Sequence, residues 1–255
     1  MGLSFLVAQD PFVLDSAGTG AITQSIANSI QIADVNKDGV NDIILSGYDS
    51  TRFGVFLDVM LGSADGSLSQ GYQTYINTYP DTIAEYLGGI GGVDLADVNR
   101  DGWMDLYLTG SALSKLYLNS SGSFNVSSNL PSMSLSYSDG KWGDVNMDGA
   151  PDLFVMGVTS SDQILNELYI NNDTSLDEDL TTIFPSLFNG NSSWGDYDND
   201  GDPDLIICGQ TADKTASVTR FYQNEPTGRL SELTTADAVG GLKSGAFHFA
   251  DLDAD

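Results

Sequence analysis

The chain carries the motif Leu95-Ala-Asp-Val-Asn-Arg-Asp-Gly-Trp-Met-Asp105, and this motif returns along the whole of its 255 residues. Similar motifs occupy residues 32–42, 142–152 and 194–204, and a fifth begins at residue 249 and is incomplete at Asp255. Their first aspartates, at positions 34, 97, 144, 196 and 251, recur at intervals of 63, 47, 52 and 55 residues. A period of this length is typical of a blade of four short β-strands.

The residues around each motif predict the strands that it joins. A small residue always precedes the first aspartate, and a large apolar residue precedes that one, as in Trp142-Gly143. An apolar run such as Leu153-Phe-Val155 follows each complete motif. Because these runs lack the alternation of a half-exposed strand, we expect them to be buried on both faces between neighbouring sheets. A third strand such as Leu168-Tyr-Ile-Asn171 and a weaker fourth strand complete each unit, and no segment has sustained helical periodicity.

The repeated Asp-x-Asn/Asp-x-Asp-Gly-x-x-Asp pattern before an apolar strand resembles the FG-GAP/VCBS family, which forms the blades of the integrin alpha-subunit β-propeller. The resemblance implies an all-β fold, a β-propeller of four-stranded antiparallel blades, with about four to five blades present as part of a seven-bladed propeller. We treat residues 1–255 as one propeller region. Its expected parts are the outer strands of a preceding or closing blade at 1–19, blades at 20–78, 88–130, 138–182 and 190–236, and the truncated start of a further blade at 245–255.

Counted from its first aspartate as position one, each motif places carboxylate or amide oxygens at positions one, three, five and nine, with glycine at position six. Hard oxygen donors at alternate positions of a tight loop suit Ca²⁺, which accepts about six to eight oxygens, and the carbonyl at position seven would add a fifth ligand. We therefore predict about four calcium sites and an incomplete fifth. The predicted ligands are Asp34, Asn36, Asp38, Val40 and Asp42; Asp97, Asn99, Asp101, Trp103 and Asp105; Asp144, Asn146, Asp148, Ala150 and Asp152; Asp196, Asp198, Asp200, Asp202 and Asp204; and Asp251, Asp253 and Asp255. The fourth site is expected to bind most tightly, because all of its side-chain ligands are charged.

An EF-hand, a metal-free acidic turn and a magnesium site all fit these loops less well than a calcium site. An EF-hand requires a bidentate glutamate at position twelve and flanking helices, whereas this chain has apolar residues at that position and strands around it. Acidic turns without metal would bring like charges together, and the nearby cations Lys37 and Arg100 occupy outward-facing loop positions. Mg²⁺ dehydrates reluctantly and rarely fills an all-protein cage. Calcium is therefore predicted, in a structural role.

The charge of the chain excludes several classes of partner. The sequence has 36 Asp and Glu but only 9 Lys and Arg, a formal net charge of -27. A nucleic-acid partner is excluded, because phosphate binding depends on clustered basic residues, and an anionic membrane surface is disfavoured for the same reason. No apolar run reaches the roughly 18 residues that membrane insertion needs. The charge favours a basic, neutral or calcium-bridged partner.

The resemblance implies a secreted or cell-surface protein. Four sequons, at Asn119, Asn125, Asn172 and Asn191, would be glycosylated in a eukaryotic secretory pathway. The single cysteine, Cys208, excludes an internal disulfide framework and falls in an apolar run typical of the core.

The loops between the second and third strands, and those between blades, vary in length and lie at the end of the blades opposite the metal loops. Variable loops on a rigid scaffold are where binding usually resides, so we predict a ligand face that includes Tyr48, Asp49, Arg52, Tyr79 and Tyr86. No nucleophile elbow, phosphate loop or histidine-bearing metal motif occurs. We therefore predict a non-catalytic module that binds protein or glycan. A structural block of an extracellular coat or filament, and the propeller part of a carbohydrate-active enzyme, stay open as alternatives.

Overall fold

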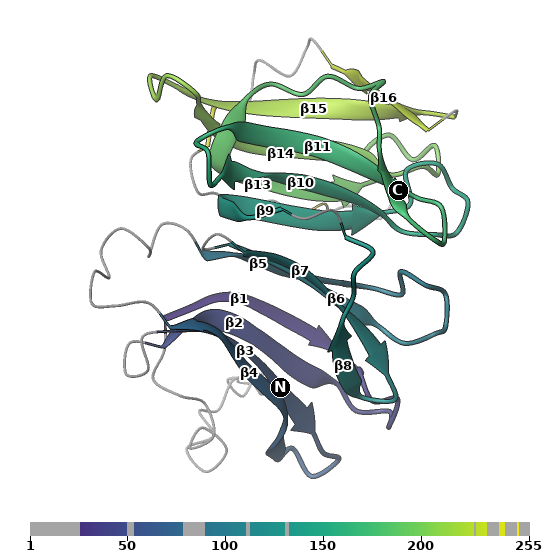
Figure 1. The fold of residues 1–255 in the computed structure, drawn as a ribbon. Coiled ribbons are helices and arrows are strands. Elements are labelled where there is room, and N and C mark those ends of the chain that lie inside the picture. The colour runs from purple at the N-terminus through teal and green to yellow at the C-terminus, as the bar shows by residue number, and fades with distance from the viewer. Residues whose placement is uncertain are drawn as a thin grey trace, which may run out of the picture.

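The computed structural model describes residues 26–49, 54–78, 90–110, 113–130, 133–226, 228–233, 240–242 and 249. Within these residues the regular elements are all strands, arranged in four antiparallel sheets of four strands each. The sheets follow one another in chain order and lie face to face, from the purple first sheet to the yellow-green fourth (Figure 1). The all-β, four-stranded antiparallel prediction is confirmed, and the four sheets do not close into a ring.

Each sheet is an antiparallel meander in which every strand pairs with the next along the chain. The first sheet contains β1 (Ile26–Ala33), β2 (Asp42–Asp49), β3 (Gly54–Gly62) and β4 (Leu68–Thr78). The second contains β5 (Ile90–Ala96), β6 (Asp105–Gly110), β7 (Leu113–Ser120) and β8 (Ser123–Val126). The third contains β9 (Leu135–Gly143), β10 (Asp152–Thr159), β11 (Ile164–Asn171) and β12 (Leu176–Glu178). The fourth contains β13 (Leu187–Gly195), β14 (Asp204–Thr211), β15 (Ser217–Glu225) and β16 (Arg229–Glu232).

The motif joins the first and second strands of each sheet in the same register. The small residue before the first aspartate pairs with the ninth residue counted from that aspartate in every sheet: Ala33 with Asp42, Ala96 with Asp105, Gly143 with Asp152, and Gly195 with Asp204. Residues 34–42, 97–105, 144–152 and 196–204, called the first to fourth loops below, therefore leave their sheets at equivalent points.

The second strand of each sheet is buried on both of its faces, as the apolar runs predicted. All six residues of β6 are buried, and its successive side chains enter different cores. Leu106 belongs to the core between the first and second sheets, whereas Tyr107 belongs to the core between the second and third. In β10, Leu153 and Phe154 likewise face opposite neighbours. Since side chains alternate across a strand, an apolar run is what a sheet between two other sheets requires.

The small residue before the first aspartate of the motif makes room for the next sheet. A Cβ atom on Gly143 would lie 2.6 Å from the indole ring of Trp194, which comes from the first strand of the fourth sheet. A Cβ atom on Gly195 would similarly meet the ring of Phe249 at 2.2 Å. The large apolar residue of one repeat thus covers the small residue of the repeat before it, as expected for a crowded interface between first strands.

Several expectations fall outside the described residues. These are the outer strands at 1–19 and most of the further blade at 245–255, of which only residue 249 is described. The division of the chain into a seven-bladed propeller stays a prediction.

Candidate metal centre

The first aspartate of each motif folds its loop back on itself. In the first loop, the Asp34 carboxylate accepts hydrogen bonds from the backbone N–H groups of Asp38, at 3.1 Å, and Gly39, at 2.8 Å. The carboxylates of Asp97, Asp144 and Asp196 accept the same pair of bonds in their own loops. The glycine at position six has a φ between 86° and 96° in all four loops, a conformation that glycine adopts without steric cost.

The ninth residue of each motif is a buried aspartate that also joins two strands. Asp152 is fully buried, and its two oxygens accept bonds from the N–H groups of Val145, at 2.9 Å, and Asn171, at 2.8 Å. Asp42, Asp105 and Asp204 each accept an equivalent pair of bonds. Burial raises the pKa of Asp105 and of Asp152 to about 6, while these N–H donors act in the opposite direction. The ninth aspartate is thus part of the fold as well as a predicted ligand.

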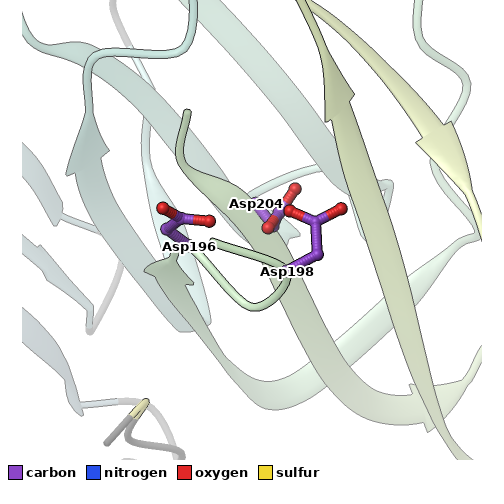
Figure 2. A group of neighbouring side chains, drawn as sticks. All are labelled: Asp196, Asp198 and Asp204. Atoms are coloured by element: carbon purple, nitrogen blue, oxygen red, sulfur yellow. The ribbon is translucent and has the colours of Figure 1, made fainter. Parts of the chain in front are cut away.

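The fourth loop brings three carboxylates together. One oxygen from each of Asp196, Asp198 and Asp204 lies within 4.8 Å of the other two (Figure 2). Among the described residues this is the one cluster of three or more acidic, histidine or cysteine side chains with that geometry. Oxygens that bind the same Ca²⁺ at about 2.3–2.6 Å lie at most about 5 Å apart, so the donor set and its spacing fit calcium.

The first three loops differ from the fourth at position three, where they carry asparagine. Asn99 accepts a bond from the N–H group of Asp101 at 3.0 Å, and its amide donates to the Asp101 carboxylate at 3.1 Å. Asn36 and Asn146 make the same two bonds. Asp198 has no hydrogen to donate, and its carboxylate instead accepts a bond from the Gln223 amide at 2.6 Å. The first three loops therefore contain an internal amide–carboxylate bond that the fourth lacks.

The predicted ligands at position seven are backbone groups of the loops, and those of the fifth motif lie outside the described residues. At position seven, the backbone N–H groups of Val40, Trp103, Ala150 and Asp202 donate to the carboxylate at position five. The Asp202 side chain is buried, and its Oδ1 has no hydrogen-bond partner among the described residues. The ligands predicted at Asp251, Asp253 and Asp255 lie outside the described residues.

The repeats of this chain match a known family of protein repeats. A model of the FG-GAP-like repeat family matches residues 34–108, 97–155, 144–207 and 196–255, so that each match begins at the first aspartate of a loop. The chain belongs to this family. The sequence-based assignment is therefore confirmed. A search of curated proteins finds no match.

Two solved structures are similar to parts of this FG-GAP-like chain. One is a lectin of Agrocybe aegerita, described as recognising non-reducing terminal N-acetylglucosamine, with a TM-score of 0.45 and 16% identity over 79% of this chain and 64% of the lectin. The other is a biofilm matrix protein of V. cholerae, with a TM-score of 0.40 and 14% identity over 85% of this chain and 40% of that protein. The chain thus spans less than two thirds of the length of either protein.

An asparagine at the end of the third strand connects neighbouring FG-GAP-like repeats, a role that sequence reasoning missed. The Asn171 amide donates to the carbonyl of Val98 in the second loop at 2.8 Å. Asn119 donates to Val35 in the first loop at 2.9 Å, and Asn224 donates to Val145 in the third at 2.7 Å. The signal was present, because all three asparagines follow the same aromatic-containing strand ending: Leu116-Tyr-Leu-Asn119, Leu168-Tyr-Ile-Asn171 and Phe221-Tyr-Gln-Asn224.

This bond bears on the predicted glycosylation sites. Asn119 is 1% exposed and its amide is held by two backbone carbonyls, so the folded chain does not present it for glycosylation. Asn125 and Asn172 are exposed and Asn191 is half-buried, and their glycosylation stays a prediction.

The predicted ligand face is only partly described. Tyr48 and Asp49 are the last two residues of β2, and Arg52, Tyr79 and Tyr86 lie outside the described residues.

Lys37 and Arg100 are exposed but do not simply face outward, since each reaches the loop of the following sheet. No helix long and apolar enough to cross a membrane occurs among the described residues.

Proposed function

We propose that this chain is a calcium-stabilised, non-catalytic module of the extracellular space or cell surface, which binds a protein or glycan partner. The observation that carries the calcium part is the convergence of Asp196, Asp198 and Asp204 oxygens within 4.8 Å in a loop of FG-GAP-like geometry. Calcium there would neutralise carboxylates that otherwise repel one another, and would hold the connection between β13 and β14.

A non-catalytic binding role is supported by the hydrogen bonds that the acidic residues of the loops accept from the backbone. The first, fifth and ninth aspartates accept backbone hydrogen bonds that shape each loop. These carboxylates act in connections within a sheet, which favours a scaffold over a catalytic site. The net charge of -27 favours a basic or neutral partner, or one bridged by calcium.

A recess on the described surface has a size that suits a small ligand group. It has a volume of about 540 Å³ and is lined by Asn146, Ile170, Asp179, Thr181, Gly228 and Arg229. These residues come from the third loop, from β11, from the segment that follows β12, and from β16 with the turn before it. The recess therefore combines an apolar side chain with hydrogen-bond donors and acceptors next to a predicted metal site, as binding sites commonly do.

Calcium is expected to raise the melting temperature of the chain. A site filled at one hundred times its Kd adds about 2.7 kcal/mol to the free energy of unfolding, which corresponds to about 5–10 °C for a domain of this size. The measurement is thermal unfolding in excess chelator, in millimolar Ca²⁺ and in the same concentration of Mg²⁺. Equal melting temperatures in chelator and calcium would contradict the calcium part of the proposal.

Binding of a partner is expected to depend on calcium. The test is a glycan array together with a pull-down of extracellular proteins, each carried out with calcium and with chelator. A saturable partner that is lost in chelator supports the binding module. Ordered self-assembly of the purified chain in electron micrographs, with no soluble partner found, would instead favour the coat or filament alternative.

A further inference from the structure

The residue at position four of every loop adopts the same unusual backbone conformation. Lys37, Arg100, Met147 and Asn199 have φ angles of 57°, 57°, 56° and 58°. This left-handed conformation is uncommon for residues other than glycine, and it sets the direction of the side chain relative to the loop. Side chains at position four therefore leave their loops from equivalent backbone geometry in all four repeats.

Two of these side chains carry a positive charge to the loop of the next repeat. The Lys37 ammonium of the first loop lies over the Trp103 ring of the second, 4.3 Å from its centroid. It is also packed against Gly102, where an added Cβ atom would be 2.9 Å from Nζ. Lys37 thus contacts positions six and seven of the second loop, which lie between its predicted side-chain ligands Asp101 and Asp105.

Arg100 of the second loop makes the corresponding contact with the third. Its Nη1 donates a hydrogen bond to the carbonyl of Asp148 at 3.3 Å, and its Nη2 forms an ion pair with the Asp173 carboxylate. Asp148 is the fifth residue of the third loop, and Asp173 follows β11 in the same sheet. The guanidinium therefore ties the second loop to two points of the third repeat.

The fourth loop receives no such cation from position four of the third. Met147 occupies that position, and its side chain is 60% exposed. The fourth loop nevertheless has the largest negative charge, with aspartates at positions one, three, five, seven and nine. Asp198 replaces the asparagine that donates a bond in the other loops, and the buried Asp202 Oδ1 has no partner among the described residues. Neither Asp198 at position three nor the uncharged Met147 of the third loop supplies a positive charge that would offset the repulsion.

We propose that Lys37 and Arg100 are latches that hold the second and third loops in their folded geometry without metal, and that the fourth loop depends on calcium for the same geometry. Two like charges a few ångströms apart repel each other, and a nearby cation offsets part of that repulsion. The latch contacts involve the protein alone, whereas the calcium dependence of the fourth loop rests on the proposed function. Chelation should therefore loosen the fourth loop while leaving the second and third loops in place.

Hydrogen exchange of equivalent amides tests this difference. The N–H groups at positions five to seven donate to carboxylates in each of the four loops, so they report the same geometry. In excess chelator, we expect the amides of Asp200, Gly201 and Asp202 to exchange at least about tenfold faster than in calcium. The equivalent amides of the second and third loops should change less than about threefold. An equal change in all four loops would overturn the proposal.

Variants separate the latches from calcium binding. In chelator, Arg100→Gln should speed exchange in the third loop by about fivefold, and Lys37→Gln should do so in the second. The matched control is Lys214→Gln, since Lys214 lies over the Phe188 ring of its own sheet, and it should leave all four loops unchanged. If Arg100→Gln behaves like this control, the latch proposal is wrong.

A gain-of-contact variant completes the test. Met147→Arg places a guanidinium at position four of the third loop, the position that Arg100 occupies in the second loop. This variant should slow hydrogen exchange of the fourth-loop amides in chelator by about fivefold. No slowing would count against the claim that position four directs the contact. If calcium alters exchange in none of the loops of the unmodified chain, the proposed calcium function fails, and the effect of Arg100→Gln in chelator still decides the latch.

Discussion

Replacement of Asp152 by alanine is expected to lower the free energy of unfolding by about 1–3 kcal/mol, even when no calcium is present. The carboxylate is fully buried and accepts bonds from the N–H groups of Val145 and Asn171. Alanine leaves the Asn171 N–H buried without a partner, at a cost of about 1–3 kcal/mol, and it leaves the Val145 N–H with only its 3.1 Å bond to the Gly143 carbonyl. The measurement is urea unfolding in excess chelator, so that loss of a metal ligand does not contribute.

The control for this prediction is a second aspartate of the same loop. Asp148 is exposed, so Asp148→Ala should cost less than about 1 kcal/mol in chelator. Asp152→Asn should be intermediate, because its one amide oxygen can accept from only one of the two N–H directions. If Asp152→Ala and Asp148→Ala have equal effects in chelator, the ninth aspartate has no structural role and acts as a metal ligand alone.

The sequence motif predicts the role of Asp152 as a metal ligand but not its role as a hydrogen-bond acceptor between strands. Spacing alone marks Asp152 as an oxygen donor, because the pattern of alternate acidic and amide residues is local. Its bonds to Val145 and Asn171 join the loop to the start of the motif and to the third strand, and they appear only when the strands are paired. The alternating pattern therefore predicts the loop, while the energetic importance of its last residue depends on the sheet.

The parts of the structure that sequence reasoning predicted are those with local causes. The apolar runs after each motif predicted strands buried on both faces, and β6, β10 and β14 confirm this. The contacts between repeats were not predicted, because they join residues far apart in the chain. Asn119 and Val35, for example, are separated by 84 positions. Lys37 and Arg100 were assigned to outward-facing positions, and their partners in the next loop could not be known without the packing of the sheets.

The first strand of every sheet contains a bulge, which the sequence motifs did not predict. The register shifts between Ala27 and Ser29 in β1, between Ile90 and Val93 in β5, within residues 136–139 of β9, and between Phe188 and Asn191 in β13. Bulges re-aim the side chains that follow them. After the bulge in β13, the N–H and hydroxyl groups of Ser192 both donate to the Asp139 carboxylate of the third sheet at 2.7 Å. The bulge thus supports a polar contact between repeats.

A side chain at Gly190, in the bulge of β13, is expected to destabilise the protein strongly. A Cβ atom at this position would lie 1.7 Å from the carbonyl oxygen of Cys208 and 2.6 Å from the Cα atom of Gly209, both in the backbone of the buried strand β14. Backbone atoms of a central strand cannot move aside as a flexible side chain can. Gly190→Ala should therefore lower the free energy of unfolding by about 3 kcal/mol, or the melting temperature by on the order of 10 °C.

The matched control for Gly190→Ala is Gly240→Ala, because a Cβ atom on Gly240 meets nothing within 4 Å. That variant should unfold within about 0.5 kcal/mol of the unmodified chain. The damage at Gly190 should also reach the neighbouring repeat, since displacement of β13 separates Ser192 from the buried Asp139 carboxylate. Faster hydrogen exchange at the Ser192 amide in Gly190→Ala, with the amides of the first loop unchanged, would show that the bulge holds the two repeats together. Equal stability of the two glycine variants would mean that β13 accommodates a side chain at the bulge, and that the contact between the third and fourth sheets does not depend on it.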